Sequence, residues 1–216
     1  MLDLRDHAQR HIYFYGMSEP ETTQLVRTLV EPGSVALDVG ANCGYYALTF
    51  ADLGATVHAF EPQAALAHTL RESVQLNGAR VTVVEAACGA EAGETMLYES
   101  SDPYFSGMAT LVAEYYTLSR PATPVPVVAL DDYCAANALA PALVKIDVEG
   151  FEAEVIAGMA RIMAEHRPTI VCEVALDRAQ GERALELLTQ AGYAGTPIGP
   201  DPAGGVANVC FRPGAR

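Results

Sequence analysis

The chain has 216 residues, a length that suits one α/β domain with a full hydrophobic core and is short for two domains. Half of its residues (50%) are hydrophobic, as expected for a parallel sheet that is covered on both faces. With 13 Lys and Arg against 27 Asp and Glu, the formal net charge is −14, which argues against binding to nucleic acid or to an anionic membrane.

The sequence shows no targeting or membrane segment. Its first residues are charged and lack the apolar core of a signal peptide, and no apolar run approaches the length of a membrane span. The five cysteines are scattered without a C-x-x-C pair, so neither a disulfide framework nor a cysteine metal cluster is expected. We therefore expect a cytoplasmic protein, and the sequence leaves open whether it forms a homodimer.

Apolar strands alternate with amphipathic helices along most of the chain, a pattern that predicts an α/β fold with a parallel sheet. An N-terminal helical segment at 1–33, with Ser18 as a helix N-cap, precedes a single domain at 34–216. In chain order we expect a helix at 18–30, a strand at 34–38, a helix at 43–53, a strand at 56–60, a helix at 62–77, strands at 81–85, 94–99 and 124–130, a helix at 131–137, a strand at 142–147, a helix at 150–165, a strand at 169–174, a helix at 182–191 and a hairpin strand at 206–211.

Residues 100–120 interrupt this alternation. They are polar and aromatic and show no clear period. Segments of this length inside compact domains are commonly functional lids or disordered loops, and the sequence leaves the choice open.

A glycine turn over residues 38–44, with the pattern Asp-x-Gly-x-Asn-x-Gly, joins the first strand to its helix. A dinucleotide fingerprint starting at Gly40 requires glycines where this chain has Asn42 and Tyr45, and no Gly-Lys-Ser/Thr of a phosphate-binding loop follows. The turn therefore suits a ligand that has a carboxylate and an amine but no phosphate, such as S-adenosylmethionine. Glu61, at the end of the next strand, is placed to meet its ribose hydroxyls.

Three motifs at strand ends together carry a family resemblance. The glycine turn, Phe-Glu-Pro at 60–62 and Lys-Ile-Asp-Val-Glu-Gly at 145–150 resemble the FkbM-type S-adenosylmethionine-dependent methyltransferases, from about Ser34 to Glu173. This resemblance implies the Rossmann-like class I methyltransferase fold, with a mostly parallel seven-stranded sheet, helices on both faces and a C-terminal antiparallel hairpin. We also expect the N-terminal segment at 1–33 to cap the active site.

The resemblance implies where the cofactor is held. Asp38 would organise the methionine end, and the strand end at Glu85 and Ala86 would meet the adenine ring. Tyr45 is one of several aromatic residues that could surround the sulfonium, together with Tyr13, Tyr15, Tyr46, Tyr104 and Phe105. The expected cofactor-binding residues are Asp38, Gly40, Asn42, Gly44, Tyr45, Glu61, Pro62, Glu85, Ala86 and Asp147.

Asp147 and Glu173 are the expected catalytic residues, because they end adjacent strands where ligands of α/β sheets collect. An alternative interpretation makes Asp147 a helix N-cap with Glu149 in the first turn, and Lys145 is expected to pair with a neighbouring acid. Asp147 and Glu173 are also the candidate ligands for Mg²⁺. Two carboxylates make a thin metal site, and a metal is not expected.

The strand end at Asp147 also bears on the acceptor. Enzymes that methylate planar nitrogens typically carry Asn/Asp-Pro-Pro-Tyr/Phe there, whereas this chain has Asp-Val-Glu-Gly at 147–150. O-methylation of a small-molecule hydroxyl, on a natural product or a sugar as the resemblance implies, is therefore favoured. A nicotinamide-dependent oxidoreductase and a non-catalytic binding module with this fold are the alternatives.

Overall fold

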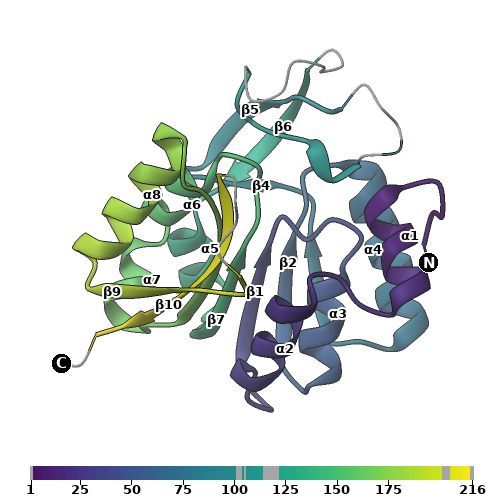
Figure 1. Ribbon diagram of the computed structural model, residues 1–216, viewed down its shortest axis with the longest axis horizontal. Helices are drawn as coiled ribbons and strands as arrows, with labels where there is room; N and C mark the ends of the chain where they lie inside the picture. The colour runs from purple at the N-terminus through teal and green to yellow at the C-terminus, as the bar shows by residue number, and fades with distance from the viewer. Residues whose placement is uncertain (1, 101–103, 105, 114–121, 201–204, 215–216) are drawn as a thin grey trace.

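The computed structural model describes residues 2–100, 104, 106–113, 122–200 and 205–214, which form an α/β domain around a seven-stranded sheet (Figure 1). The strand order is β3-β2-β1-β7-β8-β10-β9. Strands β3, β2, β1, β7 and β8 run parallel, while β10 pairs antiparallel with both β8 and β9. The strands are β1 (Val35–Val39), β2 (Thr56–Phe60), β3 (Val81–Val84), β7 (Pro141–Ile146), β8 (Thr169–Ala175), β9 (Tyr193–Pro197) and β10 (Val206–Pro213). The predicted mostly parallel sheet and C-terminal antiparallel hairpin are confirmed.

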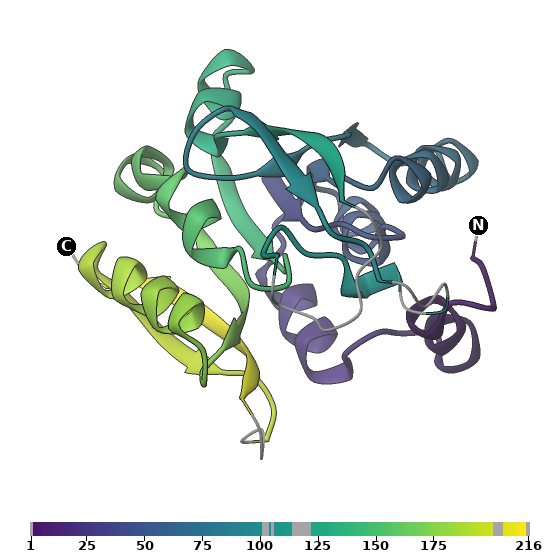
Figure 2. The same ribbon diagram turned by 90° about the horizontal axis from the view of Figure 1, so that it is seen from above.

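Helices cover both faces of this sheet (Figure 2). They are α1 (His7–Tyr15), α2 (Pro20–Leu29), α3 (Tyr45–Asp52), α4 (Ala64–Asn77), α5 (Leu130–Ala136), α6 (Glu152–Ala157), α7 (Ala160–Glu165) and α8 (Ala179–Gln190). Neighbouring residues of β1 show why the central strands read as continuous apolar runs. Leu37 packs into a core with α5 to α8, whereas Ala36 packs into a second core with α2 to α4. Both faces of the strand are therefore buried.

A second, three-stranded sheet is the main feature that the sequence did not reveal. It has the order β4-β6-β5 and consists of β4 (Ala87–Cys88), β5 (Gly93–Leu97) and β6 (Thr123–Val128). The expected strands at 94–99 and 124–130 exist with shifted bounds, and Leu130 begins α5 instead. A short 3-10 helix, η1 (Ser106–Met108), lies in the segment that joins β5 to β6. Residues 101–103, 105 and 114–120 of the expected 100–120 loop lie outside the described residues.

The single helix expected at 150–165 is two helices, α6 and α7, because of contacts with distant segments. Gly158 interrupts it: a Cβ at this position would lie 2.0 Å from the carbonyl oxygen of Gly89. The backbone carbonyl of Gly158 accepts a hydrogen bond of 2.9 Å from the N–H of Asp131. The Asp131 carboxylate then accepts bonds from the N–H groups of Arg161 and Ile162, at the start of α7.

The N-terminal segment contains two helices. Asp6 begins α1 by accepting a hydrogen bond from the N–H of Gln9, and Gly16 ends it in the left-handed region. The expected Ser18 cap of α2 is wrong, since the N-cap is Glu19, whose side chain makes no capping hydrogen bond. In the described part of the chain, no helix combines the length and apolar composition that crossing a bilayer requires.

Candidate active site

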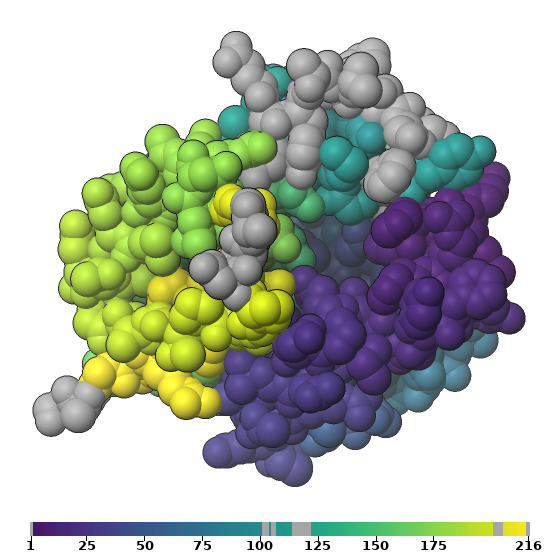
Figure 3. Space-filling model, in the orientation of Figure 1, coloured from purple at the N-terminus to yellow at the C-terminus, as the bar shows by residue number. Residues whose placement is uncertain are grey.

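A cavity of about 270 Å³ lies beyond the carboxyl ends of β1, β2 and β7. Figure 3 shows the surface hollowed between the purple N-terminal part of the chain and the teal second sheet. The walls of the cavity come from the turns after β1, β2 and β7, from residues 86–88, and from the N-terminal segment. Eight of the expected site residues line it, namely Gly40, Asn42, Tyr45, Glu61, Pro62, Ala86, Asp147 and Glu173.

The two glycines of the turn let protein segments approach each other closely. Gly40 has φ of 82°, and a Cβ there would lie 1.8 Å from the backbone oxygen of Asp147. Gly44, with φ of 87°, is the N-cap of α3, and its Cβ would lie 2.1 Å from Cδ1 of Leu70. Gly44 does not line the cavity. The glycine turn thus packs closely against the loop after β7 and against α4, and it leaves no room for a side chain at Gly40 or Gly44.

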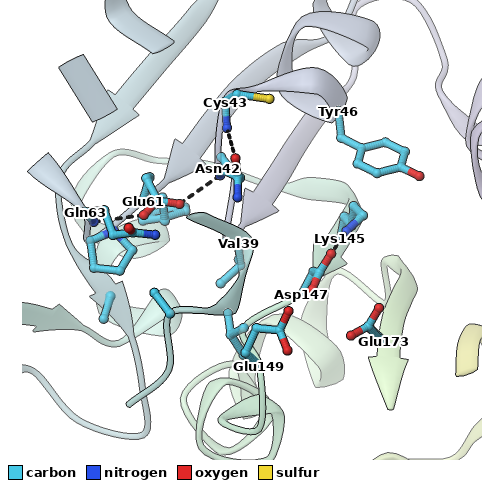
Figure 4. A pocket seen from close by; sticks show the side chains of 18 of the residues that line it. Val39, Asn42, Cys43, Tyr46, Glu61, Gln63, Lys145, Asp147, Glu149 and Glu173 are labelled. Carbon is cyan, nitrogen blue, oxygen red and sulfur yellow. Dashed lines mark hydrogen bonds and ion pairs between the residues drawn. The ribbon is translucent and has the colours of Figure 1, made fainter. Parts of the chain in front are cut away.

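Glu61 is fixed by backbone groups of the turns that follow β1 and β2 (Figure 4). Its Oε2 accepts a hydrogen bond of 2.8 Å from the N–H of Asn42, and its Oε1 accepts one of 2.8 Å from the N–H of Gln63. Only 3% of Glu61 is exposed. Burial, opposed by these two N–H groups, raises the pKa of Glu61 to about 7. A carboxylate held in this way keeps lone pairs with which it can accept hydroxyl hydrogen bonds.

Two expected cofactor residues lie away from the cavity wall. Asp38 is 1% exposed, and burial raises its pKa to about 6 although the charge of Lys145 acts against this. Among the described residues, Oδ2 of Asp38 has no hydrogen-bond partner. Glu85 is exposed and pairs with Arg71 at 2.8 Å. The structure brings neither side chain to the cavity, and their contact with a cofactor stays a prediction.

Asp147 is bound to a buried cation. Nζ of Lys145 lies 2.8 Å from Oδ2 of Asp147, which confirms the expected pairing, and 4.5 Å from the ring centre of Tyr46. Lys145 is 2% exposed. Burial alone would lower the pKa of Lys145, but neighbouring carboxylates, Asp147 first among them, outweigh burial and raise it. Lys145 is therefore a permanent positive charge at the floor of the cavity.

Three carboxylates gather at this end of the cavity, one more than the sequence indicated (Figure 4). Asp147, Glu149 and Glu173 each offer one oxygen, and these oxygens lie within 4.8 Å of one another. The charge of Asp147, followed by burial, raises the pKa of Glu173 strongly. Since a second negative charge beside Asp147 is unfavourable, Glu173 keeps its proton at neutral pH.

The alternative role of Asp147 as a helix N-cap does not agree with the structure. The N-cap of α6 is Phe151, and Glu149 precedes the helix with φ of 54°. The carbonyl of Glu149 accepts a hydrogen bond of 2.6 Å from Oγ1 of Thr110. Asp147 is thus free of a capping role and faces the cavity.

The N-terminal segment contributes side chains that sequence reasoning missed. Ala8 and Ile12 of α1 line the cavity, as do Ser18 and Glu19. No local pattern marks these residues, because they reach the site only through the tertiary fold. Of the aromatic candidates, Tyr45 and Tyr46 line the cavity, whereas Tyr13, Tyr15 and Tyr104 are 51–70% exposed and Phe105 lies outside the described residues.

The sheet order, the antiparallel hairpin and a cavity at the strand ends define the class: a Rossmann-like domain with the class I methyltransferase fold. The sequence model of the methyltransferase FkbM domain matches residues 38–194. The chain therefore belongs to the FkbM methyltransferase family.

Solved structures agree on the fold. An FkbM methyltransferase from Methylobacillus flagellatus KT has a TM-score of 0.60 and 16% identity, with 97% of this chain and 62% of that chain covered. The chain thus spans less than two thirds of that protein. Magnesium protoporphyrin IX methyltransferase from Synechocystis PCC 6803 with bound SAM has a TM-score of 0.53 and 12% identity, covering 95% and 94% of the two chains.

An rRNA methylase from Streptococcus thermophilus is similar as well, with a TM-score of 0.56 and 10% identity over 89% of this chain and 93% of that chain. At identities this low, the similarity shows a shared fold alone. No curated protein matches the chain. The acceptors named for these similar proteins differ, so they do not identify the acceptor of this chain.

Proposed function

We propose that the protein transfers a methyl group from S-adenosylmethionine to a hydroxyl group of a small molecule. One observation carries the proposal: a single cavity joins the glycine turn and Glu61 at one end to the Asp147–Glu173 pair at the other. The donor supplies a methyl group that is already activated on a sulfonium. The chain's own residues then have to hold the two reactants in line and accept one proton.

The residues at the turn fit this donor better than a dinucleotide. Asn42 carries a side chain where a pyrophosphate would need a glycine, and it adopts φ of 51°. Among the described lining residues, Lys145 is the one cationic side chain, and Asp147 already binds it. A pyrophosphate would therefore meet carboxylates without a free basic partner. Glu61 would hold the ribose hydroxyls, and Ala86, which is 3% exposed, leaves room for a flat base.

Asp147 is the proposed general base. Lys145 binds Oδ2 of Asp147, which leaves Oδ1 to accept the proton of an acceptor hydroxyl as its oxygen attacks the methyl carbon. Glu173 keeps its own proton because the charge of Asp147 raises its pKa. The hydroxyl proton therefore passes to Asp147 alone, and Lys145 balances the charge of the carboxylate before the reaction.

The charge of the cavity favours a neutral acceptor. Among the described lining residues, five side chains are acidic (Glu19, Glu61, Asp147, Glu149 and the protonated Glu173), against one cation that is already paired. An RNA or another polyanion would be repelled there. A neutral hydroxyl compound, such as a sugar, a polyketide or a phenol, would not.

The direct test is incubation with labelled S-adenosylmethionine and a panel of sugars, polyketides, phenols and ribosomal RNA. We expect label to pass to hydroxyl compounds and the transfer to require Asp147. Label found in RNA alone would overturn the acceptor class.

Calorimetry with S-adenosylhomocysteine and NADH tests the donor, and binding of NADH alone would favour an oxidoreductase. Binding of S-adenosylhomocysteine without transfer to any acceptor would indicate a non-catalytic module.

Treatment with a chelator tests whether turnover requires a metal ion or only the charge of the buried lysine. Turnover on a hydroxyl acceptor is expected to stay within about twofold after treatment with EDTA, because Lys145 already supplies a cation to Asp147. The assay is repeated after adding Mg²⁺ to the treated protein. A loss of turnover that Mg²⁺ restores would contradict this expectation and would make Asp147, Glu149 and Glu173 metal ligands.

The pKa of Glu61 predicts how cofactor affinity depends on pH. Burial raises the pKa of Glu61 to about 7, and the ionised carboxylate is the better acceptor for two ribose hydroxyls. The affinity for S-adenosylhomocysteine is therefore expected to fall by up to about tenfold per pH unit below pH 7. Titration calorimetry from pH 5.5 to 8 measures this. The Glu61→Gln variant should show a flatter profile, and an equally steep one would remove Glu61 as the cause.

A further inference from the structure

Glu19 holds an unusual backbone conformation at the rim of the cavity. It lies between α1 and α2 and has φ of 42° and ψ of 75°, in the left-handed region that costs free energy for residues with a side chain. Its side chain lines the cavity and is half-buried. A strained residue persists where its surroundings require it, so the contacts of its carboxylate are of interest.

Both carboxylate oxygens of Glu19 are bound, each by a different part of the fold. Oε2 accepts a hydrogen bond of 2.6 Å from the hydroxyl of Tyr46 in α3, and Oε1 accepts one of 2.7 Å from Nδ2 of Asn208 in β10. Hydrogen bonds to an ionised acceptor are the strong ones in proteins. Glu19 therefore fastens the N-terminal segment to both α3 and β10.

Tyr46 continues this connection to the carboxylate end of the cavity. Its ring centre lies 4.5 Å from Nζ of Lys145, and the same Nζ binds Asp147 at 2.8 Å. Tyr46 is 7% exposed, so that neither its ring nor its hydroxyl moves without disturbing the packing. The residues Asn208, Glu19, Tyr46, Lys145 and Asp147 thus form one continuous set of contacts.

We propose that Glu19 is a positioning residue that fastens the N-terminal segment over the cavity and, through Tyr46, sets Lys145 against Asp147. This inference rests on the proposed function for its use in methyl transfer. The fastening itself is a property of the ligand-free chain. Glu19 touches no reacting atom, and its effect passes through Tyr46 and the position of the segment.

Two substitutions of Glu19 distinguish the loss of its two hydrogen bonds from a general loss of stability. Glu19→Ala removes both hydrogen bonds. Glu19→Gln can keep both, because its amide oxygen can accept from Tyr46 while its amide nitrogen donates to Oδ1 of Asn208 once that amide turns over. Oδ1 of Asn208 is buried without a partner among the described residues, so it is ready to accept. The matched control is Glu21→Ala, which removes an exposed carboxylate from the first turn of the same helix.

Two measurements test these variants, both well below each variant's melting temperature. Hydrogen exchange of the ligand-free full chain reports on local opening, and calorimetry with S-adenosylhomocysteine reports on cofactor affinity. Glu19→Ala should raise amide exchange across α1 and α2 and raise the Kd by about tenfold, since charge-assisted hydrogen bonds are lost. Glu19→Gln should restore both values to within about threefold of wild type, and Glu21→Ala should change neither. Tyr46→Phe should resemble Glu19→Ala, and the double variant should add little to either single change.

Several outcomes would overturn the inference. Unchanged local exchange and unchanged Kd in Glu19→Ala would do so. A lowered melting temperature with exchange raised evenly over the chain would show a purely structural role. Failure of the wild type to bind S-adenosylhomocysteine would instead refute the proposed function, while the exchange measurement would still test the fastening.

Discussion

Replacing Asp147 with asparagine is expected to lower turnover by about 10²- to 10⁴-fold, the usual contribution of a positioned general base. The amide keeps the shape of the side chain, and its oxygen can still accept the hydrogen bond from Nζ of Lys145. It cannot take a proton from an acceptor hydroxyl. Affinity for S-adenosylhomocysteine should therefore change little, because Glu61 and the glycine turn are untouched.

The measurement is kcat on a hydroxyl acceptor together with the Kd for S-adenosylhomocysteine. Asp52→Asn is the matched control, since it makes the same change at an exposed position at the end of α3. Wild-type turnover in Asp147→Asn would refute Asp147 as the base. Parallel losses of turnover and of cofactor affinity would instead make Asp147 a cofactor ligand.

Glu173→Gln distinguishes the two members of the carboxylate pair. The charge of Asp147 raises the pKa of Glu173, so Glu173 carries a proton at neutral pH and a neutral amide resembles it. Its substitution should cost far less turnover than Asp147→Asn. The reverse order of the two losses would exchange the roles of Asp147 and Glu173.

The fold could be predicted because its signals are local. Strands β1, β2, β7 and β8 each read as a short apolar run followed by turn residues, and burial on both faces makes such runs continuous. The second sheet and the break between α6 and α7 could not be predicted in this way. They depend on contacts between distant segments, such as the carboxylate of Asp131 at the start of α7.

The site could be predicted in part, for the same physical reason. A motif at a strand end locates the cavity, but it does not say which way a side chain points. Asp38 lies one residue before the end of β1 and opposite Lys145 in the sheet, and it faces the interior. Glu61 follows the end of β2 and reaches the cavity. Glu19 could not be found from the sequence, because its partners lie 27 and 189 residues away.

Removing the Glu61 side chain should cause the largest loss of cofactor affinity. Glu61→Ala is expected to raise the Kd for S-adenosylhomocysteine by about 100-fold, because hydrogen bonds to a charged acceptor contribute about 1.5–3 kcal/mol each and two ribose hydroxyls would lose theirs. The backbone N–H groups of Asn42 and Gln63 would also lose their acceptor, so the turns themselves would relax. Turnover at saturating donor should fall less than affinity, since Asp147 remains.

The control for this prediction also tests the adenine contact expected for Glu85. Glu85→Ala removes an acid of the same type that is exposed and paired with Arg71. Because Glu85 lies away from the cavity, we expect this variant to bind S-adenosylhomocysteine with the affinity of the wild type. A large loss in Glu85→Ala would return Glu85 to the adenine site. Equal binding by the wild type and Glu61→Ala would remove the ribose assignment, and the donor would then have to be held by the turn alone.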